Sequence, residues 1–217
     1  MDELIFKKAT KSDLQFVIDC IIGAEYSGSQ ILSYCALFEI TESEFRELLI
    51  QIIDEEIEGQ PWNLEHWFIG FIDNIQVCGG CCWIEAENGI GSDMLKSQIL
   101  QYFLPEKWKM KLDELKLISE LTIPRIPNSI EVEYFYTHPD FRNRGLITSM
   151  IYFIDETFPD RNKEIIMVGN NVRAMELYKR HGYDVREIKT STQKNILTLL
   201  PSDTKVALLK KYDTRFN

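Results

Sequence analysis

Two short turn motifs in the second half of the chain combine residue types that bind phosphate. The first runs from His138 to Thr148 and contains Arg142, Arg144 and Gly145 just before an apolar helical pattern. Unpaired backbone N–H groups at a helix N-terminus attract anions, and arginine adds charge-assisted hydrogen bonds. Each such interaction contributes only about 0.3 to 1 kcal/mol when exposed, so several must act together to hold a pyrophosphate. On its own the motif also fits a solvated loop.

The second motif begins at Asn171, separated by two residues from the short segment 164–168, which is typical of a buried strand. Asparagine is a favoured N-cap, so a helix is predicted to start there. Ala174 and Tyr178 then return to the helix face on which Asn171 lies, and Gly182 ends the helix. Taken alone, this motif is also typical of an ordinary amphipathic helix with a cap at each end.

The elements before each turn are what place the two motifs together. The alternating segment Ile130–Thr137 predicts a strand before the first turn, and 164–168 predicts a short buried strand before the second. After the first turn, apolar residues recur at helical spacing, which predicts a helix packed on a sheet: Leu146, Ile147, Met150, Ile151 and Ile154. Both turns therefore lie where a parallel α/β unit places a phosphate-bearing cofactor.

In this order and separation, the two motifs resemble those of the GNAT superfamily of acyl-coenzyme A dependent N-acyltransferases, over about residues 128–185. The family's first motif, Arg/Gln-x-x-Gly-x-Gly/Ala, is matched by Arg142 and Gly145, with Ile147 in place of the small residue. The second, Asn-x-x-Ala-x-x-Leu-Tyr-x-x-x-Gly-Phe/Tyr, is the more specific match. It is met by Asn171, Ala174, Leu177, Tyr178, Gly182 and Tyr183.

The resemblance implies that acetyl-CoA, the acyl donor, binds along the strand edge and the two turns. Backbone amides of the first motif would hold the pyrophosphate, and the strand edge would pair with the pantetheine arm. The residues implied are Phe135, Tyr136, Thr137, Arg142, Asn143, Arg144, Gly145, Leu146, Ile147, Thr148, Asn171, Ala174 and Tyr178. Ile147 keeps its N–H available, although its side chain is larger than the family expects.

Direct attack of an amine on the thioester is the mechanism that the resemblance implies, with no covalent enzyme intermediate. Such a reaction needs a proton acceptor for the ammonium, an oxyanion donor and an acid for the leaving thiolate. Tyr178 occupies the position of a tyrosine that many family members aim at the thioester sulfur, so we predict it as the acid. The alternative is a core tyrosine with a satisfied hydroxyl.

The base is predicted on the strand 130–137. Period-two alternation places Glu131 and Glu133 on one face of that strand, together with Phe135 and Thr137. Glu131 precedes Arg142 by the spacing at which family members often carry a strand carboxylate, so it ranks ahead of Glu133. A solvent-facing edge, or a mechanism with no dedicated base, would also explain two acidic residues here.

Composition fits one globular α/β domain. The chain has 217 residues, 45% of them hydrophobic, and a formal net charge of −10, which argues against general affinity for nucleic acid. No apolar run approaches the roughly eighteen residues that span a bilayer, and the first residues do not resemble a secretory signal. We therefore expect a cytoplasmic protein without a membrane segment.

Five cysteines, an odd number, favour reduced thiols over a disulfide framework. Cys78 and Cys81 form a Cys-x-x-Cys pair, which is half of a zinc site, but no second close pair of Cys or His accompanies it. We expect no metal, small thiols on a buried strand, and a bulge or a close backbone approach at Gly79 and Gly80.

The first half of the chain predicts strand 4–9, a helix from Ser12, and a helix from a capping box at Thr41 to about Glu58. A hairpin of 67–72 and 75–86 turns at Asp73-Asn74. Two closing strands, 184–192 and 205–211, follow the motif region. The expected fold is one GNAT-like domain over 1–217, with a mixed, mostly antiparallel sheet flanked by helices. In the family, its central parallel pair separates to admit the cofactor.

Residues 89–129 are predicted as a largely helical insert between the third and fourth strands, interrupted at Pro105 and followed by an extended exit, 122–127. The insert precedes the predicted catalytic strand, so we hypothesise that it covers the acceptor pocket and sets substrate choice. A packing element or a homodimer contact is the alternative.

The predicted function is acetyl transfer from acetyl-CoA to a primary amine of a small molecule or a protein. The alternatives are a non-catalytic acyl-CoA sensor or interaction module on the same fold, and an enzyme that uses a longer acyl chain.

Overall fold

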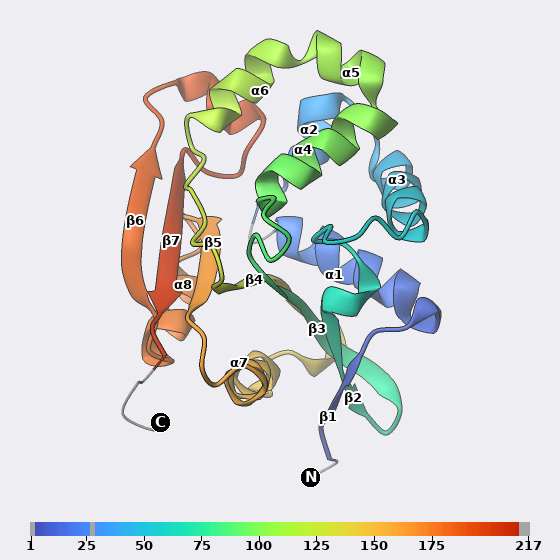
Figure 1. Cartoon of the computed structure of the whole chain (residues 1–217), viewed down its shortest axis with the longest axis vertical. Helices are drawn as coiled ribbons and strands as arrows, with labels where there is room; N and C mark the ends of the chain where they lie inside the picture. Colours follow the sequence, from blue (N-terminus) through green and yellow to red (C-terminus); the bar gives the residue numbers. More distant parts are fainter. Residues whose placement is uncertain (1–2, 27–28, 213–217) are drawn as a thin grey trace.

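The computed structural model describes residues 3–26 and 29–212, and its centre is a seven-stranded sheet in the order β1-β2-β3-β4-β5-β7-β6 (Figure 1). Strands β4 and β5 are parallel, and the other neighbouring strands of the described sheet are antiparallel. The predicted mixed sheet is therefore confirmed. The strands are β1 Ile5–Lys8, β2 Trp67–Ile72, β3 Ile75–Ile84, β4 Ile130–Thr137, β5 Lys163–Val168, β6 Asp184–Thr190 and β7 Thr204–Lys210.

Helices cover both faces of this sheet, and each face has its own apolar core. Helices α1 Leu14–Tyr26, α2 Ser33–Phe38 and α3 Glu42–Asp54 share one core with β2 and β3. Helices α7 Leu146–Thr157 and α8 Val172–Arg180 share the other core with β4, β5 and β7. Short 3-10 helices complete the described chain: Lys11–Asp13, Leu64–His66, Pro139–Phe141 and Lys194–Thr198.

Two local sequence signals in the first half of the chain, a capping box and a hairpin turn, are found where they were predicted. The Thr41 side chain accepts a hydrogen bond from the Glu44 N–H, and the Glu44 carboxylate accepts one from the Thr41 N–H, so the capping box is confirmed. The hairpin turn is also confirmed, with positive φ at both Asp73 and Asn74. Helix α3 ends at Asp54, before the predicted end, because Glu56 takes a positive φ of 48°.

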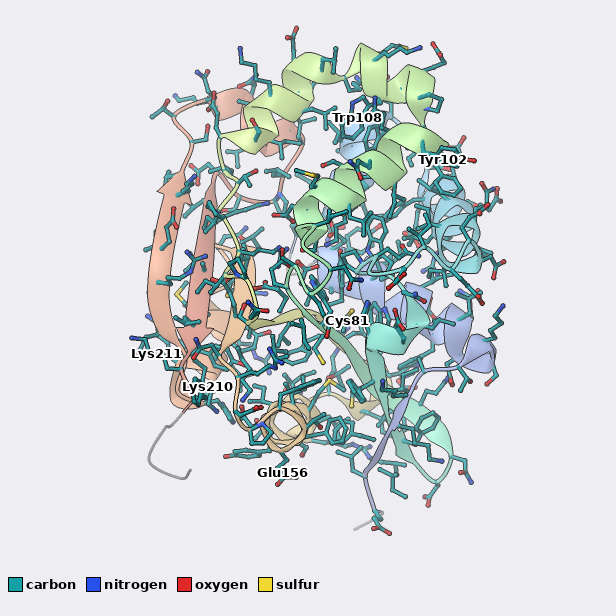
Figure 2. The ribbon with its side chains drawn as sticks, viewed as in Figure 1. Cys81, Tyr102, Trp108, Glu156, Lys210 and Lys211 are labelled. Atoms are coloured by element: carbon teal, nitrogen blue, oxygen red, sulfur yellow. The ribbon has the colours of Figure 1, made fainter. Side chains whose placement is uncertain are left out.

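The insert between β3 and β4 is helical, as predicted, and consists of α4 Ser92–Phe103, α5 Pro105–Met110 and α6 Leu112–Ser119. These helices form the green layer at the top of Figure 1. In α5, Trp108 stacks on Phe38 of α2, with ring centroids 6.2 Å apart (Figure 2). The insert is thereby fixed to the helices beside the sheet.

Strands β4 and β5 separate almost as soon as they meet. They pair only at Ile130 with Lys163 and at Glu131 with Glu164. A gap therefore opens toward the carboxyl ends of the two strands, where both turn motifs lie.

A bulge in β4 corrects the predicted alternation of its side chains. Tyr134 has a φ of 57°, and the pairing with β3 shifts between Gly79 and Cys81. As a result Tyr134 joins Glu133 on the α1 side, where its ring stacks on Trp67, whereas Phe135 packs in the α7 core. The prediction that Phe135 shares a face with Glu133 is wrong, because one extra residue reverses the alternation.

The five cysteines are free thiols, and all but the half-buried Cys35 are buried. Cys78 and Cys82 pack in the α7 core, whereas Cys81 packs in the α1 core and donates to the Pro61 carbonyl, 3.0 Å away. Cys78 and Cys81 thus point to opposite faces of the sheet. At Gly80 the close approach comes from the Phe135 ring, which an added Cβ would meet at 2.4 Å. In residues 3–26 and 29–212, no three or more His, Cys, Asp or Glu side chains are placed to hold a metal ion.

The helices that the structure describes are all too short or too polar to cross a bilayer.

Candidate active site

Two cavities meet in the gap between β4 and β5. The turn cavity, about 460 Å³, runs along the β4 edge, the 142–148 turn and α8. The inner cavity, about 480 Å³, lies among α1, α2, the insert, β4, β5 and the start of β7. The residues that line both cavities mark the point of contact: Gly23, Phe135, Asn171, Ala174 and Tyr178.

The turn cavity brings together the residues that sequence reasoning assigned to the cofactor, with one exception. Its lining includes Phe135, Tyr136, Thr137, Arg142, Asn143, Gly145, Leu146, Ile147, Thr148, Asn171, Ala174 and Tyr178. Arg144 is not among the lining residues. Its guanidinium lies 4.9 Å from the centroid of the Phe141 ring and donates to the Asp140 carbonyl.

The backbone of the turn presents donors to this cavity. Gly145 takes a φ of 77° immediately before α7, and Ser149 makes the first hydrogen bond of the helix, to the Gly145 carbonyl. The N–H groups of Leu146, Ile147 and Thr148 precede that bond and have no acceptor within the helix. An added Cβ at Gly145 would meet nothing within 4 Å, so glycine is required for its conformation and not for space.

Helix α8 supplies a cap and further positive charge. The Asn171 side chain accepts from the Ala174 N–H at 3.1 Å, which confirms the predicted N-cap. Arg173 and Arg180 line the turn cavity beside Arg142, and Arg173 donates to the Asn143 side chain at 2.9 Å. Sequence reasoning missed both arginines, although their spacing of seven residues places them on one helix face.

Tyr178 lies at the junction of the two cavities. Its side chain is buried against Phe135, with ring centroids 6.2 Å apart, and burial raises the pKa of its phenol well above 10.0. The hydroxyl therefore stays protonated across the physiological range and can donate a proton or a hydrogen bond.

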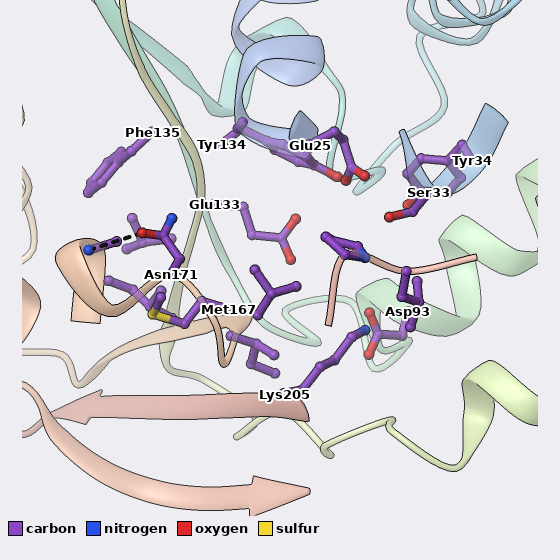
Figure 3. A pocket seen from close by; sticks show the side chains of 18 of the residues that line it. Glu25, Ser33, Tyr34, Asp93, Glu133, Tyr134, Phe135, Met167, Asn171 and Lys205 are labelled. Atoms are coloured by element: carbon purple, nitrogen blue, oxygen red, sulfur yellow. Dashed lines mark hydrogen bonds between the residues drawn. The ribbon is translucent and has the colours of Figure 1, made fainter. Parts of the chain in front are cut away.

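The inner cavity has walls that sequence reasoning did not foresee. Glu25, Ser33 and Tyr34 line it from α1 and α2, and Lys205 enters from β7 (Figure 3). The insert contributes Asp93, Lys96, Ile118 and Arg125 to the same cavity. The insert thus forms part of the wall of this cavity, and its role as a cover of the acceptor pocket stays a prediction. No local pattern marks these residues, because the fold assembles them from six separate segments.

Glu133 is held in an ion-pair network inside this wall. Lys96 Nζ lies 2.8 Å from Glu133 Oε2, and Arg125 pairs with the same carboxylate. Burial opposes ionisation, but the charges of Lys96 and Arg125 outweigh it and lower the pKa of Glu133 to about 2. Glu133 is therefore a carboxylate whose oxygens are occupied.

Glu131, the predicted base, lies outside both cavities. Its side chain is 0% exposed, pairs with Arg125 and accepts from the Ser129 hydroxyl at 3.2 Å. Glu131 is absent from the lining of either cavity. Arg125 thus stands between this carboxyl and the inner cavity.

Glu25 is a further carboxylate in the lining of the inner cavity. Among the described residues, no lysine, arginine or histidine forms an ion pair with it. Burial raises its pKa, with Lys96 acting in the opposite direction. A carboxylate with a raised pKa at the cavity wall is suited to accept a proton.

Comparison with known proteins links this geometry to one family. Residues 100–183 match the model of the acetyltransferase (GNAT) family. An N-acetyltransferase from Staphylococcus aureus Mu50 has a TM-score of 0.61 at 12% identity, covering 94% of this chain and 99% of that chain. An agmatine N-acetyltransferase has a TM-score of 0.57 at 12% identity, and the match covers 97% of this chain and 100% of that chain. A Drosophila melanogaster polyamine N-acetyltransferase has a TM-score of 0.53 at 10% identity, and the match covers 96% of this chain and 100% of that chain.

A search of curated proteins returned no match. At these identities the structural likeness shows the fold alone.

Proposed function

We propose that this chain, a member of the GNAT acetyltransferase superfamily, transfers an acetyl group from acetyl-CoA to a primary amine by direct attack. The observation that carries the proposal is the meeting of two cavities at Tyr178, in the gap between the parallel strands. One cavity has the chemistry for a phosphorylated donor. The other has the chemistry for an amine.

The turn cavity suits the donor because its charges and free N–H groups complement a pyrophosphate. Arg142, Arg173 and Arg180 line it, and the first turn of α7 adds unpaired backbone donors. The β4 edge beyond the bulge is open, because β5 has already diverged from it. Open strand N–H and C=O groups suit the amide-bearing pantetheine arm.

The inner cavity suits the acceptor, and two side chains would handle the protons. The amine must lose a proton before or during attack, and Glu25 is the group that we infer accepts it. The nitrogen forms a bond to the thioester carbonyl carbon, and the carbon–sulfur bond then breaks. Tyr178 donates its phenolic proton to the leaving thiolate. The proton that Glu25 takes from the ammonium passes to solvent, and the second proton, which the nitrogen loses as the amide forms, restores the phenol of Tyr178 through solvent.

The test combines a binding measurement with a turnover measurement on the full chain. We expect coenzyme A to raise the melting temperature, and acetyl-CoA with a panel of primary amines to release free thiol. The panel includes agmatine and spermidine, beside amino acids and a lysine-containing peptide. Release with acetyl-CoA that exceeds release with longer acyl-CoA would support acetyl as the group transferred.

Each contrary outcome has its own meaning. A melting-temperature shift without thiol release from any amine would favour a non-catalytic acyl-CoA sensor. Faster release from a longer acyl-CoA would favour a different acyltransferase. No shift with coenzyme A would contradict the donor assignment itself.

A further inference from the structure

Lys205 places a positive charge in the inner cavity that the proposed chemistry does not use. It lies near the start of β7, where its backbone pairs with Val168, and its side chain extends into the cavity (Figure 3). In the part of the chain that the structure describes, its ammonium forms no ion pair within 4.0 Å and no hydrogen bond. The Lys205 Nζ atom is not among the fully buried side-chain atoms that lack a hydrogen-bond partner, so a ligand can reach it. The ammonium is therefore available to a ligand.

The other cations of this wall already have partners. Lys96 is bonded to Glu133, and Arg125 pairs with Asp93, Glu131 and Glu133. Their charges are offset within the wall and leave little for a ligand. Burial lowers the pKa of Lys205, whereas Asp93 and Glu25 act in the opposite direction. An anion bound beside it would stabilise the charged form.

Glu25 and Lys205 give the cavity one negative and one positive site. Figure 3 shows them entering from opposite walls, with Glu25 on α1 and Lys205 on β7. Each appears among the charges that shift the other's pKa, and both line the same cavity. The cavity lining also contains apolar side chains: Leu37, Ile118, Ile166, Leu200 and Pro201.

We propose that the acceptor is an amino acid or a similar small amine that carries a carboxylate, and that Lys205 binds this carboxylate while the amine lies toward Glu25. This inference rests on the proposed function. An ammonium–carboxylate contact in a site largely removed from water is stronger than the same contact at the surface. A polyamine would instead bring a second ammonium toward Lys205, which like-charge repulsion disfavours.

The decisive experiment compares amines that differ only in a carboxylate. Leucine is compared with 3-methylbutylamine and leucinamide, and arginine is compared with agmatine, by thiol release from acetyl-CoA. We expect kcat/KM for the carboxylate member to exceed that of its partner by roughly 10- to 100-fold, which is typical of a hydrogen bond to a charged group. The inference would be overturned if kcat/KM for leucine and for arginine were equal to or lower than kcat/KM for the matching amines without a carboxylate.

Variants of Lys205 then assign the preference to this side chain. Lys205→Met should reduce the ratio of the two kcat/KM values to near one, and Lys205→Arg should retain most of it. The matched control is Lys211→Met, which removes the same charge from an exposed position outside the cavity (Figure 2). A ratio that survives in Lys205→Met, while the melting temperature shows a folded protein, would also overturn the inference.

Failure of this inference differs from failure of the proposed function. Thiol release from neutral amines without a carboxylate preference would leave an acetyltransferase with another acceptor class. Absence of release from every amine would contradict the proposed activity, and the inference would fall with it.

Discussion

Glu131 of β4 and Glu164 of β5 lie opposite each other at the last position where the two parallel strands pair, and both side chains are fully buried. Arg125 pairs with Glu131, and Arg186 pairs with Glu164. The Ile126 N–H also donates to Glu164 at 3.1 Å. This pair of carboxyl groups lies at the closed end of the gap, away from the cavities. It is therefore placed to hold the strands together and not to contact an acceptor.

Stability should depend on pH through Glu131. Burial raises its pKa from 4.5 to about 9; Arg125 acts in the opposite direction, whereas Glu164 and Glu133 raise the pKa further. The folded protein thus holds a proton that the unfolded chain releases near pH 4.5. The contribution of protonated Glu131 to the free energy of unfolding is fully present below pH 4.5 and is lost as the pH rises toward 9. The free energy of unfolding falls by at most about 1.4 kcal/mol per pH unit over this range.

Glu131→Gln tests this because glutamine resembles the protonated carboxyl. Urea unfolding at several pH values between 5 and 9 should show a smaller decline of unfolding free energy in the variant than in the original protein. Parallel declines in the two proteins would mean that Glu131 is ionised in the folded state.

The proton acceptor should be Glu25. We expect Glu25→Gln to lower kcat/KM by about 10²-fold, chiefly at pH values below the pKa of the amine, where a proton must still be removed. The comparison variant is Glu131→Gln, which alters the carboxylate predicted from the strand pattern. If the pH–rate profile changes in Glu131→Gln and stays unchanged in Glu25→Gln, the base is Glu131 on β4.

Much of the fold could be predicted because its signals are local. A capping box, a two-residue hairpin turn and an N-cap asparagine each act within a few residues, and each was found where predicted. The bulge at Tyr134 could not be predicted, since a non-glycine residue with φ of 57° leaves no pattern in the sequence. It reverses the side chains that follow it.

The acceptor site escaped prediction for a different reason. The donor residues lie in two continuous motifs, whereas Glu25 and Lys205 are separated by most of the chain and meet only in the folded protein. The position of Glu131 gave a second difficulty. Strand periodicity assigns a face to a residue, but it does not reveal that Arg125 from the insert covers that face.

Tyr178 should act as the acid in the transfer step. Tyr178→Phe removes the hydroxyl and keeps the ring that packs near Phe135, so binding of coenzyme A should be unchanged. We expect kcat to fall by about 10²-fold, the lower range for loss of an acid catalyst. Tyr183→Phe is the matched control, because this buried ring lies 5.8 Å from Tyr178 but lines neither cavity. A similar fall in both variants would indicate a packing effect.

Gly145 should contribute to donor binding through its backbone conformation. Its φ is 77°, and that of Gly89 is 79°; neither would bring an added Cβ within 4 Å of another group. Alanine at either position should therefore cost a similar 1 to 2 kcal/mol, roughly the strain of a left-handed residue with a side chain. Only Gly145 lines the turn cavity, so only Gly145→Ala should also weaken coenzyme A binding, as measured by calorimetry. Equal affinities in Gly145→Ala and Gly89→Ala would mean that the turn adjusts without loss, and that the donors of α7 do not depend on this residue.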